Sequence, residues 1–153
     1  MIAIALLLVT AAAPDPSQVE RFVLEQTNAY RESQGVHALR PEARLSKVAR
    51  EFASTLAKRD ELEHDAGGST IDARILKGGY RPCAWAENIV YEYRSREFTA
   101  QELATAFVKD WRESSGHRRN MLSRDVKDIG IGVARSERTG RLYGVQVFAR
   151  ECR

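Results

Sequence analysis

The stretch "DIGIGVARSERTGRLYGVQVFAR", residues 128–150, decides the fold class of this chain. Apolar side chains alternate with other residues along both of its halves, which is the pattern of half-buried strands. The segment "SERTG" between the halves predicts a hairpin turn with Gly140 in the left-handed conformation. Gly130 and Gly132 lie on one face of the first strand. They predict that a neighbouring element of the fold packs very close to this face. Its opposite, apolar face consists of Ile129, Ile131 and Val133.

Helical periodicity dominates the chain before this hairpin. The clearest helix follows Pro41, because apolar side chains recur at intervals of three and four residues from Leu45 to Ala57. A helix is also expected over residues 17–34, with Ser17 as its N-cap and Glu20 completing a capping box. Two further helices are expected, one over residues 70–77 capped by Ser69 and one from Thr99 to Trp111 with a capping box completed by Glu102.

The segment "YRPCAWAENIVYEY", residues 80–93, mixes turn residues with residues that favour strands. Helices combined with a small, mainly antiparallel sheet make the expected fold class α+β. The length of 153 residues suits one domain with one core.

The charge pattern argues against nucleic acid as a partner. The formal net charge is +3, and the Lys and Arg residues are scattered without a basic block or an aromatic platform. We therefore expect a basic, solvated surface, with weak attraction to anionic surfaces or cell walls as the alternative. We also expect a monomer.

The N-terminus has the features of a secretory signal peptide. Residues 2–9 are apolar and residues 10–13 are mostly small, although no Lys or Arg precedes Arg21. We expect a signal peptide over residues 1–13 and a mature domain over residues 14–153. Because signal peptides usually begin with a basic segment, the start of this one is expected to be truncated. This predicts a secreted, extracellular or periplasmic protein, and no other apolar run is long enough to span a membrane.

The chain has two cysteines, Cys83 and Cys152. In an exported protein an even number of cysteines favours one disulfide, here between the middle and the end of the domain. A catalytic cysteine is the less favoured alternative, because neither residue has a histidine close by in sequence or begins a helix.

Three residues of the chain are candidates for a functional site: His64, Glu87 and His117. Each histidine follows an expected helix, and Glu87 stands among apolar and aromatic neighbours in "WAENI". Two imidazoles and a carboxylate suit zinc, but their spacing matches no local metal motif, so solvated or capping histidines remain the alternative. His37 is expected to be an ordinary loop residue. No nucleophile elbow is present, which argues against a serine hydrolase.

Taken in order, several segments resemble the CAP superfamily, which comprises cysteine-rich secretory proteins, antigen 5 and pathogenesis-related protein 1. The resemblance covers about residues 19–149 and is greatest to the bacterial SCP-domain branch. The segments that carry it are "NAYRESQGVHALRPEARLSKVAREFASTLA", the histidine at 64, "GY" at 79–80, "AENI" at 86–89, "SSGHRRNML" at 114–122, and "IGIGVA" with "YGVQVFA".

The resemblance implies a three-layer α-β-α sandwich with a cleft that carries two histidines and two glutamates. His64, Glu87 and His117 match three of these residues. The fourth position is Ser114 here, and Glu113 lies one residue earlier, which on a helix is a rotation of about 100°. The set is therefore incomplete. Asn120, Met121 and Leu122 are expected to anchor the segment that follows His117.

Two functions are compatible with these features. The favoured one is a secreted binding module, whose cleft holds zinc or another divalent cation and a small apolar, lipid or sterol ligand or a cell-wall or host-surface component. The alternative is a metal-assisted, protease-like hydrolase in which Glu87 acts as the base toward a metal-bound water. The absence of a second glutamate favours the binding module, because paired acid and base carboxylates are missing.

Overall fold

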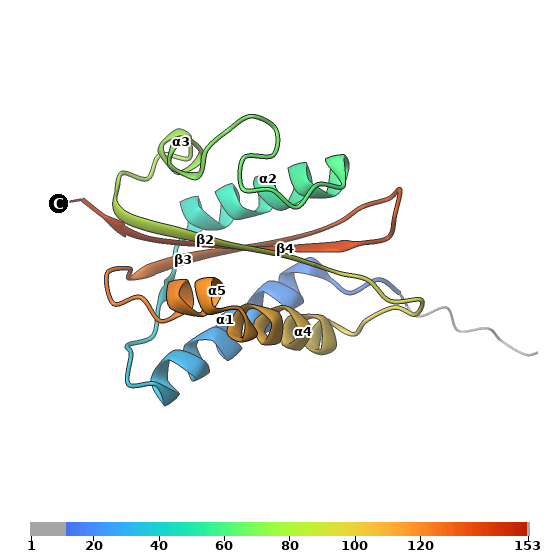
Figure 1. The fold of residues 1–153 in the computed structure, drawn as a ribbon, viewed down its shortest axis with the longest axis horizontal. Coiled ribbons are helices and arrows are strands. Elements are labelled where there is room, and N and C mark those ends of the chain that lie inside the picture. Colours follow the sequence, from blue (N-terminus) through green and yellow to red (C-terminus); the bar gives the residue numbers. More distant parts are fainter. Residues whose placement is uncertain (1–11, 153) are drawn as a thin grey trace, which may run out of the picture.

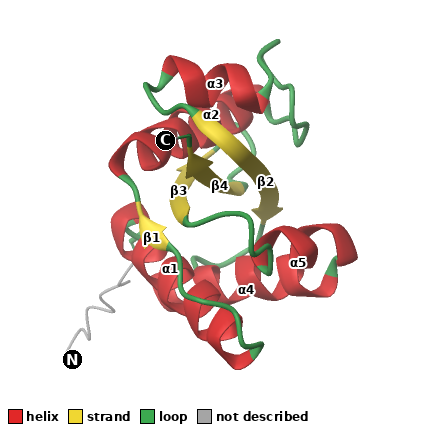
Figure 2. Cartoon of the chain, turned by 90° about the vertical axis from the view of Figure 1, so that its left-hand side faces the viewer, coloured by secondary structure: helices red, strands yellow, loops and turns green. Residues whose placement is uncertain are grey.

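A computed structural model describes residues 12–152 and shows a sheet between two layers of helices (Figures 1 and 2). The three-layer α-β-α sandwich is therefore confirmed. Helices α2 and α3 cover one face of the sheet, and α1, α4 and α5 cover the other (Figure 1). The elements are α1 (Pro16–Ser33), β1 (Arg40–Pro41), α2 (Ala43–Arg59), α3 (Ile71–Lys77), β2 (Pro82–Glu92), α4 (Ala100–Glu113), α5 (Ser115–Met121), β3 (Asp128–Arg135) and β4 (Leu142–Glu151).

The sheet is built around the predicted hairpin. Its strand order is β1-β3-β4-β2, with β4 antiparallel to both of its neighbours and the short β1 parallel to β3. Gly140 lies in the turn between β3 and β4 with a φ of 75°, as predicted. Strand β2 is an edge strand, and the segment expected to mix turns and strand residues forms 11 residues of continuous strand.

The two faces of β3 pack against different helical layers. Ile129, Ile131 and Val133 join the apolar core that α1 and α4 form on one side of the sheet. On the other side α2 lies so close that a Cβ added at Gly130 would overlap the backbone of Leu45. A Cβ at Gly132 would overlap the backbone of Ala49 in the same way. The predicted close approach is thus the seating of α2 on the sheet.

The first helix begins one residue before its predicted start. Asp15, not Ser17, is the N-cap, since its carboxylate accepts a hydrogen bond from the backbone N–H of Ser17 at 3.1 Å. Proline at the first helical position favours this choice, because its φ is already helical and it has no N–H to satisfy. Glu20 does not complete a capping box; it is buried and accepts a hydrogen bond from Arg50 at 2.6 Å.

Other predicted helix boundaries had mixed outcomes. The capping box between Thr99 and Glu102 is present at the start of α4. Helix α3 is preceded by Thr70 rather than Ser69, and no side chain caps it. No helix was expected after the one that ends near Trp111, but Ser115–Met121 form the short helix α5.

The disulfide between Cys83 and Cys152 is present. It ties the start of β2 to the residue after β4, where the backbone N–H of Cys152 also donates to the carbonyl of Arg81 at 2.8 Å. Most of the expected signal peptide, residues 1–11, lies outside the described residues. Within residues 12–152, no helix is long and apolar enough to cross a membrane.

Candidate functional site

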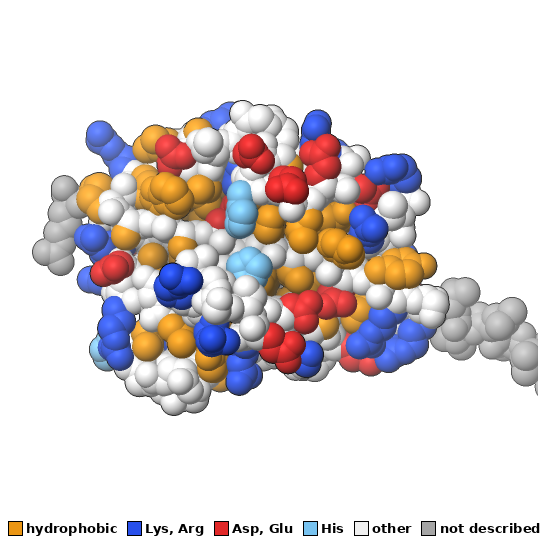
Figure 3. All heavy atoms as spheres, in the orientation of Figure 1, with side chains coloured by type: hydrophobic (Ala, Val, Ile, Leu, Met, Phe, Trp, Pro, Cys, Tyr) orange, Lys and Arg blue, Asp and Glu red, His pale blue; other side chains and the backbone are white. Residues whose placement is uncertain are grey.

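The three candidate residues come from three different elements. His64 lies in the loop after α2, Glu87 is in β2, and His117 is in α5. Nδ1 of His64 lies 2.9 Å from Oε1 of Glu87. His117 is near enough to His64 for the charge of one imidazole to lower the pKa of the other. Figure 3 shows two histidine side chains close together in the middle of one face. We call His64, Glu87 and His117 the histidine site.

Glu87 is the buried member of the histidine site. Its side chain is 2% exposed, whereas that of His64 is 57% exposed. The second carboxylate oxygen, Oε2, accepts a hydrogen bond from Nη2 of Arg74 at 2.6 Å. Both oxygens of Glu87 therefore already have partners within the protein.

Arg74 of α3 is a residue that the sequence analysis missed. Its guanidinium lies 3.5 Å from the centre of the Phe52 ring and also donates to the backbone carbonyls of His64 and Ser69. It thus neutralises Glu87 and fixes the loop that carries His64. No local pattern marks this role, because Arg74 has the sequence context of an ordinary polar residue of a short helix.

The bond to Glu87 determines which nitrogen of His64 is free. An ionised carboxylate can only accept hydrogen bonds, so Nδ1 of His64 carries the hydrogen. In the neutral imidazole the lone pair then lies on Nε2, which is available to bind a metal ion or a proton. Histidines that bind a metal through one ring nitrogen commonly donate a hydrogen bond from the other ring nitrogen to a carboxylate.

A buried amide network supports the other half of the histidine site. Asn88 is fully buried next to Glu87 in sequence, and its Nδ2 donates to the carbonyl of His117 at 3.2 Å and to Oε1 of Gln146 at 3.0 Å. Gln146 in turn donates to Thr27 of α1 at 2.8 Å. The network therefore links α5, β2, β4 and α1. Asn88 was also missed, although a second polar residue in an otherwise apolar strand segment was a usable signal.

Two of the three residues expected to anchor the segment after His117, Asn120 and Met121, do so. Asn120 donates to the carbonyl of Glu87 at 3.2 Å and to Oδ1 of Asn88 at 2.9 Å, and Met121 is fully buried. These contacts attach α5 to β2. They compensate for the shortness of a seven-residue helix that no side chain caps.

The two histidines have opposite pKa shifts. The hydrogen bond to Glu87 raises the pKa of His64 above its usual value, and burial opposes this only in part. Burial lowers the pKa of His117, and the neighbouring His64 lowers it further. Near neutral pH, His117 is therefore the more fully deprotonated of the two.

Glu113 lies outside the histidine site, as the expected helical rotation implied. Its side chain is 64% exposed and pairs with Lys109 on the outer face of α4. Ser114 is the residue between α4 and α5. His37 is exposed in the loop between α1 and β1, a segment that contributes no residue to the histidine site.

The donors present limit what kind of metal ion fits. Among residues 12–152, no group of three or more His, Cys, Asp or Glu side chains is arranged to hold a metal. With Glu87 engaged by His64 and Arg74, the histidine site offers two imidazole nitrogens. Such a pair suits a borderline cation such as zinc, with its other ligands supplied by water or by a bound molecule.

Exposed aromatic side chains flank the histidine site along β2. Successive side chains of a strand alternate between faces, so Trp85 and Tyr91 lie on the same face of β2 as Glu87. Trp85 is 47% exposed and Tyr91 is 39% exposed. This edge of the sheet therefore places apolar surface on both sides of a polar centre.

Comparisons with known proteins agree on one family. The sequence model described as "CAP: Cysteine-rich secretory protein family" matches residues 24–148. The uncharacterized protein YkwD of Bacillus subtilis (strain 168) is 32% identical over 130 residues, which cover 83% of this chain and 47% of YkwD. The chain thus spans about half the length of that relative.

Solved structures show the same fold. An extracellular protein containing an SCP domain from Bacillus anthracis str. Ames matches with a TM-score of 0.76 and 20% identity, over 89% of this chain and 41% of its own. An outer surface protein from Borrelia burgdorferi matches with a TM-score of 0.77 and 18% identity, over 94% of this chain and 100% of its own. Together with the family match over residues 24–148, these likenesses show that the chain belongs to the cysteine-rich secretory protein, or CAP, family.

Proposed function

We propose that this chain is a secreted binding module in which His64 and His117 hold a divalent cation. Zinc is the cation that this pair of ligands favours. The observation that carries the proposal is the bond between Nδ1 of His64 and the buried carboxylate of Glu87 at 2.9 Å. A buried carboxylate that orients an exposed imidazole prepares the free nitrogen for a ligand.

Modest affinity is expected, because two imidazoles occupy only half of a tetrahedral zinc shell. A bound zinc ion would supply a Lewis acid that attracts oxygen or nitrogen atoms of a second ligand. The role of the protein is to hold His64 through Glu87 and to hold His117 through the buried amide of Asn88.

The second ligand in this proposal is a small apolar molecule, such as a lipid or sterol, or a component of a cell surface. Its support is the exposed apolar surface of Trp85 and Tyr91 beside Glu87. Aromatic side chains at the surface contribute large contact areas with little loss of conformational freedom.

Binding is favoured over hydrolysis because Glu87 is not free to act as a base. Its two oxygens are engaged by His64 at 2.9 Å and by Arg74 at 2.6 Å. Glu113, one residue before the position of the missing glutamate, is exposed and pairs with Lys109. The hydrolase mechanism expected as the alternative requires a carboxylate that can accept a proton from water.

Secretion has independent support from the disulfide. A bond between Cys83 and Cys152 persists in oxidising compartments outside the cytoplasm. Two proteins of the same fold are described as an extracellular protein and an outer surface protein, which agrees with this location.

The test is a calorimetric zinc titration of four proteins. The parent and His37→Ala should bind one zinc ion with the same affinity, because His37 lies outside the histidine site. His64→Ala and His117→Ala should each lose at least about tenfold in affinity, as expected when one of two ligands is removed. Equal affinity in all four proteins would exclude the histidine site as the zinc site.

The hydrolase alternative is tested on the same proteins. Peptide and ester substrates are incubated with the zinc-loaded parent, His64→Ala and His37→Ala. Turnover that requires zinc and His64 but not His37 would replace the binding module by an enzyme. No turnover in a parent that binds zinc supports the binding module.

A further inference from the structure

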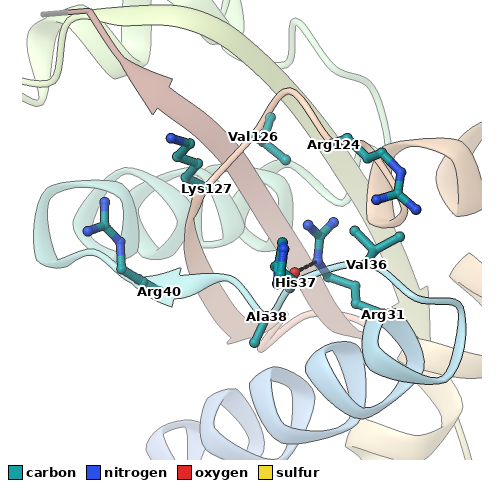
Figure 4. A pocket seen from close by; sticks show the side chains of 8 residues that line it. All are labelled: Arg31, Val36, His37, Ala38, Arg40, Arg124, Val126 and Lys127. Atoms are coloured by element: carbon teal, nitrogen blue, oxygen red, sulfur yellow. Dashed lines mark hydrogen bonds between the residues drawn. The ribbon is translucent and has the colours of Figure 1, made fainter.

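A second site lies at the C-terminal end of α1. A cavity of about 310 Å³, partly open to solvent, is lined by the last turn of α1, the loop that leads to β1 and the segment between α5 and β3. Figure 4 shows that Arg31, Arg40, Arg124 and Lys127 all line it. None of these residues belongs to the histidine site.

Arg31 forms the inner wall of this cavity and is 2% exposed. Its guanidinium donates to three backbone carbonyls, those of His37 at 2.8 Å, Met121 at 2.6 Å and Ser123 at 2.9 Å. Within the described part of the chain, no carboxylate lies within 4.0 Å of it. A buried charge is costly without a counterion, and carbonyl dipoles replace one only in part.

The other cations of the cavity have few acidic partners. Arg124 donates to the carbonyl of Gly35 at 3.0 Å, and Lys127 is exposed. Arg40 pairs with Asp128, whose other oxygen accepts a hydrogen bond from Tyr80, so this carboxylate is already engaged. Burial and the nearby Arg124 lower the pKa of Arg31, as expected where positive charge is in excess.

We propose that this cavity binds a small organic oxyanion, a phosphate monoester in particular, between the buried Arg31 and the outer Arg124 and Lys127. In Figure 4 the guanidinium of Arg31 points from α1 toward the loop that carries Arg124. Arginine side chains match the oxygens of phosphate in both charge and geometry.

The size and lining of the cavity restrict the rest of the ligand. A volume of about 310 Å³ is at the lower limit for small-molecule pockets and admits a phosphate with a few carbon atoms. Val36, Ala38 and Val126 supply apolar surface for that short organic part. This inference does not depend on the proposed function, because it uses none of the residues of the histidine site.

The test uses glycerol 3-phosphate as the soluble probe and glycerol as its neutral control. Backbone NMR shifts of residues 36–38 and 124–127 should titrate saturably with the phosphate, below about 10 mM, and should not respond to glycerol. Arg124→Gln and Lys127→Gln are the test variants. Arg31 is left unchanged, because its guanidinium donates hydrogen bonds to three backbone carbonyls and its removal would disturb the fold.

Removing one charged contact should weaken phosphate binding about tenfold. Arg119→Gln is the matched control: it removes the same charge from a position that does not line the cavity. The control should bind as the parent does. No saturable shift, or an equal loss in Arg119→Gln and Arg124→Gln, overturns the proposal.

Vesicles identify the source of the phosphate group. Phosphatidylglycerol vesicles are compared with phosphatidylcholine vesicles for the parent and Arg124→Gln. If glycerol 3-phosphate binds through Arg124 and vesicle binding also requires Arg124, the cavity takes a lipid headgroup. If glycerol 3-phosphate binds through Arg124 and vesicle binding does not require it, the cavity takes a free phosphate ester. Vesicle binding without any binding of glycerol 3-phosphate would contradict the proposal that the cavity binds a phosphate group.

Discussion

The side-chain amide of Asn120 on α5 donates to Oδ1 of Asn88 on β2 at 2.9 Å. This bond joins the helix that carries His117 to the strand that carries Glu87. Together with the bonds from Asn120 to the carbonyl of Glu87 and from Asn88 to the carbonyl of His117, it joins two of the three layers at the histidine site.

Replacing Asn120 by alanine should loosen α5. Oδ1 of the buried Asn88 loses its donor, which costs about 1–3 kcal/mol in the free energy of unfolding. Zinc affinity should fall as well, because His117 is no longer held. Chemical denaturation and zinc titration measure the two effects. Arg119→Ala, a change on the same helix, should alter neither, and equal effects in both variants would contradict the role of Asn120.

Glu87→Gln should destabilise the fold as well as the site. The guanidinium of Arg74, whose side chain is 11% exposed, is left without a counterion. Removal of one partner of a buried ion pair costs about 3 kcal/mol. Urea denaturation measures the loss, and Glu32→Gln on the exposed end of α1 is the control. A stability equal to that of the parent would show that Arg74 needs no carboxylate.

The two histidines should titrate on opposite sides of the ordinary value of 6.5. The raised pKa of His64 adds stability that is complete below 6.5 and is lost as the pH rises through its folded-state pKa. The lowered pKa of His117 adds stability that is present above 6.5 and is lost as the pH falls through its folded-state pKa. The two contributions are lost on opposite sides of pH 6.5, and NMR titration of each ring measures them separately. Identical titration curves would contradict the assignment.

Gly132→Ala should be among the most damaging single changes. A Cβ there would overlap the backbone of Ala49 in α2, so the helix would have to move away from the sheet. We expect a loss of more than about 3 kcal/mol, at the upper end for overpacking, because rigid backbone must shift. Gly116→Ala is the matched control, since nothing lies within 4 Å of its added Cβ. Thermal denaturation of both variants decides the matter; equal melting temperatures would refute the close packing.

Loss of the disulfide should lower stability strongly. Cys83 and Cys152 are 69 residues apart in sequence, and closing such a loop corresponds to about 4 kcal/mol in the chain-entropy treatment. A double Cys→Ser variant and the reduced parent should unfold at similarly lower denaturant concentrations. If the reductant leaves the midpoint of the parent unchanged although its thiols are free, the expected contribution is wrong.

The parts of the fold that the sequence predicted are those with strong local patterns. The β3–β4 hairpin, α2 and the capped start of α4 each have periodicity or a turn residue that only one structure satisfies. Helix α5 was missed because its "SSGH" start suggests a break and its stability comes from Asn120, a contact across 32 residues of sequence. The start of α1 was misplaced because Asp15 and Ser17 are both good caps, and only the position of Pro16 separates them.

The histidine site was predicted through resemblance, not through spacing. His64, Glu87 and His117 are too far apart in sequence for a local motif, and only the folded chain places Glu87 beside His64. Arg74 had no sequence signal, because its partner Glu87 is reached only when α3 packs beside β2. Predicting such a pair requires knowing the fold first.

The position of β4 has a consequence for how the chain folds. It is the last strand in sequence, yet it lies between β3 and β2, and β2 has no other partner in the described sheet. During synthesis the sheet therefore cannot close until residues 142–151 are available, and the earlier helices have no complete surface to pack on. The central strand of this sheet is therefore the last to be synthesised, and the native sheet is completed only when nearly the whole domain has been made.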